Sequence, residues 1–225
     1  PLTILSMGWG VQTWTLAAMM ALKEYPRTDL IVFADTHHEG QSTYDFANRW
    51  TPWLGEHGLN VITVEGTGTN VVREETNGSV LIPAFSKTIT NGKEGQMRRE
   101  CTHGWKITPI RQLIRQELLK RAIKINSNVV EVWQGISLDE FQRMRTSDVG
   151  YISHGYPLVD LRMKRTDCIL WLENRGLPVP PRSACTFCPY KSQAAWKQLK
   201  SSGAADWQEA LEVDEAIRHK REQNG

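Results

Sequence analysis

Ser6-Met7-Gly8-Trp9-Gly10-Val11-Gln12-Thr13 joins the apolar run Leu2–Leu5 to a helical pattern that extends from Val11 to about Lys23. A short buried strand, a glycine-bearing turn and a helix N-terminus leave backbone N–H groups and the positive end of the helix dipole facing one position. Phosphate groups bind at such positions. The stretch therefore predicts a phosphate site, although two glycines can also serve the turn alone.

Two further apolar runs follow, Leu30–Ala34 and Asn60–Val64, and a helix is expected between them over Ser42–His57. This β-α-β-α-β order predicts an α/β fold, with a doubly wound, mostly parallel sheet and helices on both faces. Such sheets bind ligands at the carboxyl ends of their strands. The opening loop and Asp35-Thr36 both lie at those ends.

The rest of the chain predicts a long polar loop and then mostly helices. The expected segments are a loop over Gly66–Gly95, helices over Ile107–Lys124 and Arg165–Asn174, a strand over Val129–Trp133, a turn and helix over Gly135–Phe141, an extended piece over Pro157–Val159, and amphipathic helices over Ser192–Lys200 and Asp206–Arg221. We expect residues 1–160 to form a nucleotide-binding α/β domain. Residues 161–225 would carry a cysteine turn and helices packed on it in the same globule.

Charge and hydropathy narrow the class of protein. The 225 residues hold 27 basic and 25 acidic side chains, so no excess charge demands nucleic acid as a partner. No apolar run approaches the roughly 20 residues that span a bilayer, and no signal-peptide pattern opens the sequence. We expect a cytoplasmic protein without a membrane partner.

Four cysteines, Cys101, Cys168, Cys185 and Cys188, are the candidate metal ligands. The cytosol keeps thiols reduced, so a disulfide framework is not expected. Cys185-x-x-Cys188 places two thiolates on one turn, and four thiolates suit a 4Fe-4S cluster or, as runner-up, a structural zinc. The alternative for Cys168 is a buried small apolar residue. Three ligands would then leave one iron open to bind a sulfur atom.

Two other phosphate loops fit the opening stretch less well. Gly8–Thr13, with Asp35 after the second strand, approaches the G-x-G-x-x-G dinucleotide pattern. Thr13 replaces the third glycine, however, and two tryptophans would crowd the turn. A Walker loop is excluded because no Gly-Lys-Ser/Thr sequence is present.

Ser6, Gly8 and Thr13 can be placed on the S-G-G-x-D-S pattern, so the stretch resembles the PP-loop of the ATP pyrophosphatases and adenine nucleotide alpha hydrolase-like proteins. Met7 replaces a glycine, and the loop has neither the aspartate nor the lysine. Downstream blocks resemble, in order, those of the iron-sulfur phosphoadenosine phosphosulfate (PAPS) reductase branch. They are Phe33–Thr36 with Glu39 and Thr43-Tyr44, Arg99–Thr102 with Lys106–Ile110, Gln134–Glu140 with Arg143, and Ser183–Pro189.

The resemblance, which spans about Leu2 to Tyr190, implies a site and a reaction class. ATP or another adenylyl nucleotide would bind at Ser6, Gly8, Gly10, Gln12, Thr13, Asp35, Thr36 and Gly135, with Mg²⁺ as an option at Asp35. Asp35 and Arg143 are the candidate catalytic residues, and Cys101, Cys168, Cys185 and Cys188 would hold the 4Fe-4S cluster. The implied chemistry is adenylation or α–β phosphate cleavage coupled to sulfur transfer, with a nucleic-acid base, a nucleotide or a small molecule as acceptor.

Several alternatives stay open. A true sulfonucleotide reductase attacks with a cysteine in a C-terminal tail, and no cysteine follows Cys188 here. A partner without turnover, in a DNA-modification or defence complex, would explain the altered loop. Asp35 could instead cap a helix, and His37 and His38 read as solvated. A homodimer, and a nucleic-acid face on the basic helix Arg111–Lys124, are further options.

Overall fold

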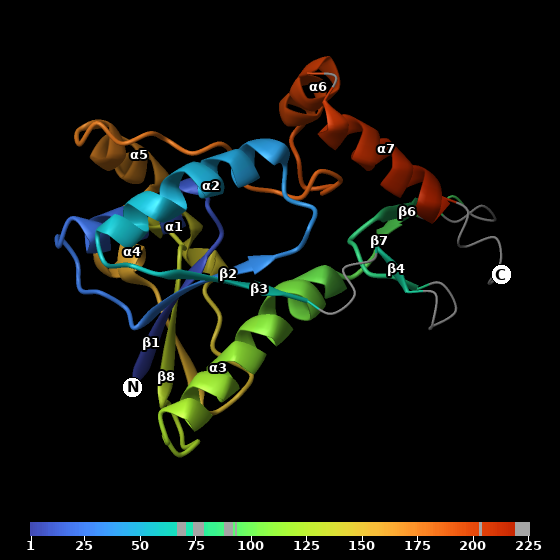
Figure 1. Ribbon diagram of the computed structural model, residues 1–225. Helices are drawn as coiled ribbons and strands as arrows, with labels where there is room; N and C mark the ends of the chain where they lie inside the picture. Colours follow the sequence, from blue (N-terminus) through green and yellow to red (C-terminus); the bar gives the residue numbers. More distant parts are fainter. Residues whose placement is uncertain (67–70, 74–78, 88–91, 93, 203, 219–225) are drawn as a thin grey trace. The chain divides into compact units, whose positions relative to one another are not determined.

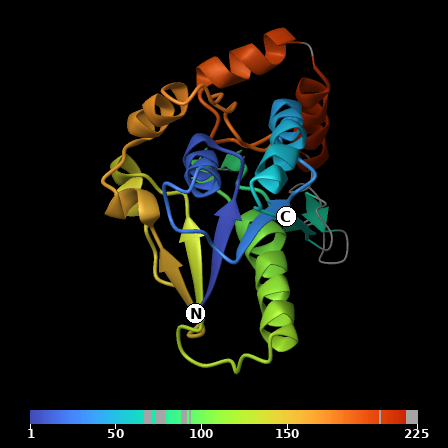
Figure 2. The ribbon, with the colours of Figure 1, turned by 60° about the vertical axis from the view of Figure 1, so that its left-hand side comes forward.

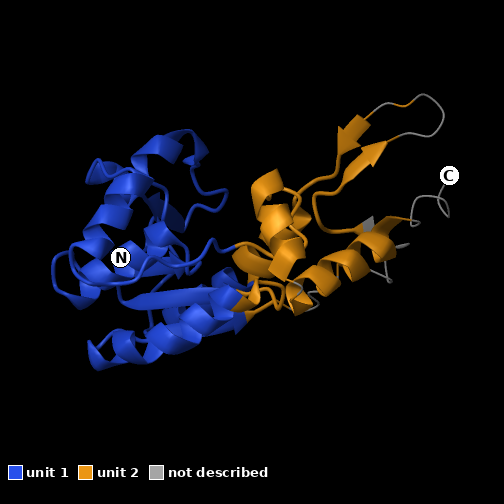
Figure 3. Ribbon diagram, turned by 90° about the horizontal axis from the view of Figure 1, so that it is seen from above, with its two compact units in different colours: residues 1–34, 42–64, 109–183 blue, residues 35–41, 65–108, 184–225 orange. Residues whose placement is uncertain are grey.

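The chain forms two compact units, each assembled from three separate stretches (Figure 3). The computed structural model describes residues 1–66, 71–73, 79–87, 92, 94–202 and 204–218. The first unit comprises residues 1–34, 42–64 and 109–183, and the second comprises residues 35–41, 65–108 and 184–225. The domain boundary expected at residue 160 stays a prediction.

The first unit is built on a five-stranded sheet in the order β3-β2-β1-β8-β9 (Figures 1 and 2). The strands are β1 (Leu2–Met7), β2 (Leu30–Asp35), β3 (Val61–Glu65), β8 (Val130–Gln134) and β9 (Ile152–Gly155). β1 pairs in parallel with β2 and β8, and β8 pairs in parallel with β9. The register sets Ile4 opposite Leu30 and Val132. The parallel α/β fold expected from the sequence is confirmed.

Alternate residues of the strands supply two separate cores, because side chains alternate between the faces of a sheet. On one face Leu5, Ile31 and Trp133 pack with α1 (Val11–Ala21), α2 (Gln41–Glu56), α4 (Pro157–Asp160) and α5 (Arg165–Glu173). On the other face Ile4 and Val32 pack with α3 (Thr108–Lys120). Helices therefore cover both faces, as a doubly wound sheet requires.

The second unit has a smaller core and carries the C-terminal helices α6 (Gln193–Ser202) and α7 (Ala205–Arg218). Two short antiparallel pairs, β4 (Val72–Arg73) with β5 (Ser79–Val80) and β6 (Phe85–Lys87) with β7 (Glu94–Gln96), lie in the expected loop Gly66–Gly95, part of which is outside the described residues. A π-helix over Thr102–Ile107 leads directly into α3. Buried members of this core are Val71, Leu81, Ile82, Trp105, Phe187 and Ala210.

One local prediction was wrong, and one expected helix has an unexpected segment before it. Pro157–Val159 is the start of helix α4 and not an extended piece, since proline is favoured at the first helical position, where its missing N–H costs nothing. The helix expected from Ile107 is preceded by the π-helix, a form that sequence periodicity does not reveal. None of the helices within the described ranges is both long and apolar enough to cross a bilayer.

Candidate functional site

The loop after β1 leaves the first turn of α1 open to a ligand. Gly10 is the N-cap residue, in extended conformation (φ −84°, ψ 168°), and no side chain caps the helix. The Thr13 hydroxyl accepts a hydrogen bond from the Gly8 N–H and donates one to the Gly10 carbonyl, each at 3.3 Å. Because a helix cannot satisfy its own first N–H groups, this turn offers donors to an anion.

Trp9 belongs to this loop, and its side chain packs into the core of the first unit. Its backbone is left-handed (φ 55°), a conformation that costs free energy in any residue but glycine. Its side chain is 1% exposed and stacks on Trp14, with ring centroids 6.3 Å apart. Both indoles therefore belong to the core, which contradicts the expectation that they crowd the turn. The Trp9 Nε1–H has no hydrogen-bond partner among the described residues.

A polar network fixes the first turn of α1 to two other elements. The Gln12 amide donates to Glu140 Oε2 at 3.1 Å and accepts from Arg165 Nη1 at 3.0 Å. Glu140 lies on a 3-10 helix (Leu138–Arg143) that follows β8, and Arg165 is the first residue of α5. The Arg165 N–H donates to Asp139 Oδ1 at 3.0 Å. Both ends of the Gln12 side chain are thus held.

Gly135 packs so closely against this turn that a side chain would not fit. A Cβ atom at residue 135 would come within 2.5 Å of Thr13 Cγ2 and 3.0 Å of the Thr13 nitrogen. Only glycine allows the strand end of β8 to reach α1 in this way. Gly135, predicted as a nucleotide-binding residue, therefore has a packing role that the structure shows directly.

Arg143, predicted as catalytic, is paired within the network. Its Nη1 donates to Glu140 Oε1 at 2.8 Å, and its side chain is largely exposed. The pairing balances the carboxylate that also accepts from Gln12. Ser6, another predicted ligand, lies inside β1 opposite Val32 and Gln134. The roles of both residues in binding or catalysis stay predictions.

Asp35 and Thr36 belong to the second unit, where each has protein contacts of its own. Asp35, the last residue of β2, accepts the His37 N–H at 2.8 Å. Thr36 is fully buried, and its hydroxyl lies 3.6 Å from Cys185 Sγ. The first residue of α2, Gln41, donates its N–H to both oxygens of Asp206. A nucleotide role for Asp35 and Thr36 is not tested by these contacts.

Three of the four cysteines gather in the second unit. Cys188 donates its N–H to the Cys185 carbonyl, closing the Cys-x-x-Cys turn, and Cys185 pairs across a β-bridge with Glu39. Burial raises the pKa of the Cys101 thiol, and the neighbouring Cys188 thiol adds to this rise. Burial and the Glu39 carboxylate raise the pKa of Cys185 to about 11.

Lys106 is one of the cations at this cluster. Its ammonium lies 3.0 Å from Glu39 Oε1, and the Glu39 side chain is only 1% exposed. Burial opposes the charge of Lys106, but Glu39 and the thiols of Cys185 and Cys101 outweigh burial and raise its pKa. A thiolate that forms at Cys101 or Cys185 would therefore find an ammonium group beside it.

Cys168, the fourth predicted ligand, lies in the core of the first unit. It is on α5, its side chain is fully buried, and it packs among the apolar residues that cover α1. Burial raises its pKa to about 11, partly offset by a hydrogen bond with Thr15. This environment matches the alternative reading of Cys168 as a buried apolar residue.

His38 and Arg165 are polar residues that the sequence analysis did not select. His38 was expected to be solvated, but its ring packs against those of Trp105 and Phe187, and its Nδ1 lies 2.6 Å from Glu209 Oε1. The aromatic residues come from distant parts of the sequence, so no local sequence pattern predicts this contact. Arg165 carried a weak signal, since it opens a helix beside Cys168.

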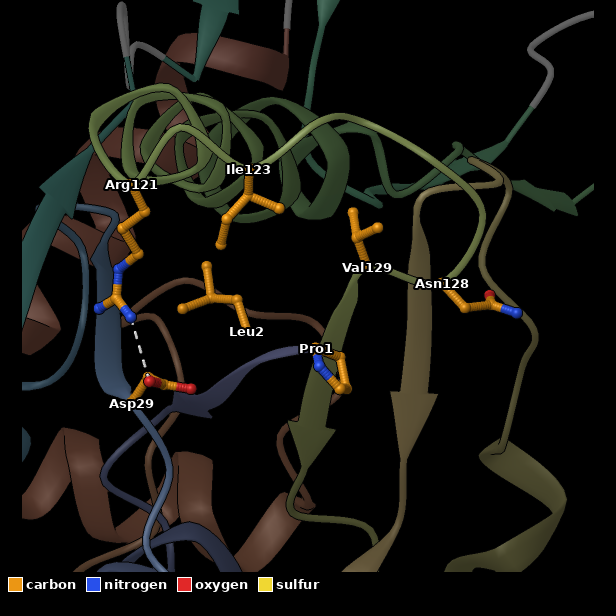
Figure 4. A pocket seen from close by; sticks show the side chains of 7 residues that line it. All are labelled: Pro1, Leu2, Asp29, Arg121, Ile123, Asn128 and Val129. Carbon is orange, nitrogen blue, oxygen red and sulfur yellow. Dashed lines mark hydrogen bonds and ion pairs between the residues drawn. The ribbon is translucent and has the colours of Figure 1, made fainter.

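A pocket in the first unit lies away from the predicted site, at the amino ends of β1 and β8 (Figure 4). Asp29 and Arg121 form an ion pair at its wall, at 3.1 Å. The basic residues of α3 have partners in the same unit: Arg111 pairs with Asp148, Arg115 lies over the Tyr151 ring, and Lys120 pairs with Glu117. A nucleic-acid face on this helix gains no support from these contacts.

Comparison with known proteins gives a distant likeness in fold. No protein-family model matches the chain, and no curated protein matches it in sequence. Among solved structures, the chain is similar to phosphoadenylyl-sulfate (PAPS) reductase from Candida auris, solved as a phosphate complex. The identity is 16% over 80% of this chain and 75% of that chain, with a TM-score of 0.49. A likeness at this level assigns neither a substrate nor a residue's role to this chain.

Proposed function

We propose that the chain binds ATP or a related adenylyl nucleotide through the loop Ser6–Thr13 and carries an iron-sulfur centre on cysteines of its second unit. The reaction class that follows is adenylation or α–β phosphate cleavage linked to sulfur transfer. The proposal rests above all on one observation, the uncapped first turn of α1 that Gln12 and Gly135 hold in place.

The loop supplies what a phosphate group needs from a backbone. Gly8 has no heavy atom within 4 Å of a Cβ position, so the chain there can be approached closely. The helix dipole and the N–H groups of the first turn stabilise negative charge at this end of α1. Where charge develops on phosphate oxygens during transfer, fixed donors of this kind lower the barrier.

The proposed centre would have three thiolate ligands, Cys101, Cys185 and Cys188. Within the described residues, no three His, Cys, Asp or Glu side chains converge closely enough to hold a single metal ion. A cluster of several irons extends over a wider set of thiolates, and Cys101, Cys185 and Cys188 share one unit with Lys106. Such a cluster would supply an iron to which a sulfur atom can bind.

The four-cysteine set is therefore reduced to three in this proposal. The Cys168 sulfur is enclosed by the core of the first unit and hydrogen-bonded to Thr15. It would have to leave that core to ligate a metal. Lys106 would favour the thiolate form of Cys101 and Cys185, which bind metal only when deprotonated.

The test uses protein purified without oxygen. ATP binding is measured by calorimetry, AMP and pyrophosphate release by chromatography, and iron, sulfide and zinc by elemental analysis. The proposal predicts micromolar to millimolar ATP binding, pyrophosphate release in the presence of a sulfur donor, and iron with sulfide in place of zinc.

Each part of the proposal can fail separately. Binding of ATP without turnover under any donor would favour the partner without catalysis, a reading that the missing loop aspartate and lysine support. Absence of ATP binding would refute the nucleotide site. A colourless protein with one zinc would refute the iron-sulfur centre.

A further inference from the structure

The loop Ser6–Thr13 contains no lysine and no arginine. Backbone N–H groups and a helix dipole supply only part of the charge that a di- or triphosphate carries. Phosphate sites in proteins usually add a lysine or arginine side chain for this reason. If the loop binds a nucleotide, a cation has to come from elsewhere in the fold.

Arg165 is an arginine that the fold holds at this turn. Its Nη1 donates to Gln12 Oε1 at 3.0 Å, and Gln12 is the second residue of α1. The Gln12 amide is itself fixed by Glu140, and the Arg165 backbone is fixed by Asp139. Gln12 therefore holds the guanidinium at the first turn, and Asp139 fixes the backbone that carries it.

The charge of Arg165 is not neutralised by its neighbours. Arg143 pairs with Glu140, and Lys164 lies close enough to Asp139 to help lower the pKa of that carboxyl, which the Ser137 hydroxyl lowers most. In the described part of the chain, no carboxylate lies within 4.0 Å of the Arg165 guanidinium. One of its five N–H donors is used on Gln12, which leaves other donors for an anion.

We infer that Arg165 is a phosphate-binding residue that supplies the positive charge missing from the loop. The inference rests on the proposed nucleotide site and names the side chain that would bind the phosphates of the nucleotide. In this arrangement Gln12 acts as a positioning residue, since it holds the guanidinium beside the open N–H groups of α1. Arg143 is occupied by Glu140 and serves to balance that carboxylate.

Arg165→Gln removes the charge and keeps a polar side chain, and Arg165→Lys restores the charge without the fork. Binding of ATP, adenosine and inorganic tripolyphosphate is measured by calorimetry for both variants and the wild type. Arg162→Gln is the matched control, because Arg162 is an exposed arginine three positions earlier. Urea unfolding without ligand checks that the variants fold.

A lost charge-assisted hydrogen bond predicts that Arg165→Gln weakens ATP and tripolyphosphate binding about ten- to a hundredfold. Adenosine binding should not change, Arg165→Lys should recover part of the loss, and Arg162→Gln should bind as the wild type does. The affinity for ATP should also depend less on salt in Arg165→Gln.

The outcomes separate this inference from the proposed function. Wild-type ATP binding that Arg165→Gln leaves unchanged would overturn the role of Arg165 and keep the nucleotide site. Tripolyphosphate binding that depends on Arg165, without any binding of ATP, would support Arg165 and overturn the nucleotide. Failure of the wild type to bind either compound would overturn both.

Discussion

The contact between Gly135 and the first turn of α1 gives the sharpest prediction. In Gly135→Ala the new Cβ would lie 2.5 Å from Thr13 Cγ2, whereas unbonded carbon atoms prefer about 3.5–4.0 Å. About 1 Å of displacement is needed, and the Thr13 backbone nitrogen at 3.0 Å blocks the simplest movement. We expect a loss of about 1–3 kcal/mol in unfolding free energy, the usual cost of overpacking, and weaker ATP binding.

A second substitution tests whether this contact is the cause. Thr13→Ser removes Cγ2 but keeps the hydroxyl that bonds Gly8 and Gly10, so Gly135→Ala with Thr13→Ser should regain part of the stability. Gly150→Ala is the control, because no heavy atom lies within 4 Å of a Cβ there. Urea unfolding and ATP calorimetry measure both quantities. A Gly135→Ala protein with wild-type stability and affinity would refute the reasoning, as would a double variant without recovery.

Three other predictions concern the cysteines, the pocket wall and the loop core. Cys185→Ala should lose most of the iron per chain, whereas Cys168→Ala should keep it and lose about 1–2 kcal/mol of stability; equal iron loss in both would restore the four-cysteine set. Burial tends to raise the pKa of Asp29, but hydrogen bonds from Thr3 and Arg121 outweigh it and lower the pKa, so its stabilising effect is present above about pH 4 and fades as pH falls through the folded-state pKa. Because the Asp29 side chain is 37% exposed and screened by solvent, Asp29→Asn should cost at most about 1 kcal/mol at pH 7 and less in acid, as urea titrations at several pH values would show; a cost independent of pH would contradict this. Trp9→Ala removes the buried indole and leaves the strain of the positive φ in place, so it should cost about 3–5 kcal/mol by the same method. A cost below about 1 kcal/mol would show that the indole does not anchor the loop.

Local pattern was enough for four of the five strands of the first unit, whereas β9 was not expected. The run Leu30–Ala34 is apolar throughout because β2 is covered on both faces, and the observed strand differs from the expected one by one residue. The turn at Gly8–Gly10 was also predicted, because a strand pattern, the glycines and a helix pattern follow one another in the sequence. Pro157 misled the reading because proline suits both extended chain and a helix start.

The site could be predicted only in part, because its contacts join distant residues. Gln12 meets Arg165 across 153 positions, and nothing in either local sequence encodes that pairing. Thr36 fits a nucleotide motif by sequence, yet its hydroxyl lies beside Cys185. Cys168 shows the same limit, since a cysteine on a helix can be either a metal ligand or a core residue until its neighbours are known.

The interleaving of the two units has a consequence for how the protein is made. All three stretches of the first unit lie before Ala184, whereas Cys185 and Cys188 belong to the last stretch of the second. A ribosome therefore completes the sequence of the first unit before it adds two of the three clustered cysteines, and units tend to fold in the order in which they emerge. The sheet and the loop Ser6–Thr13 can then begin to fold before the cysteine cluster of the second unit is complete.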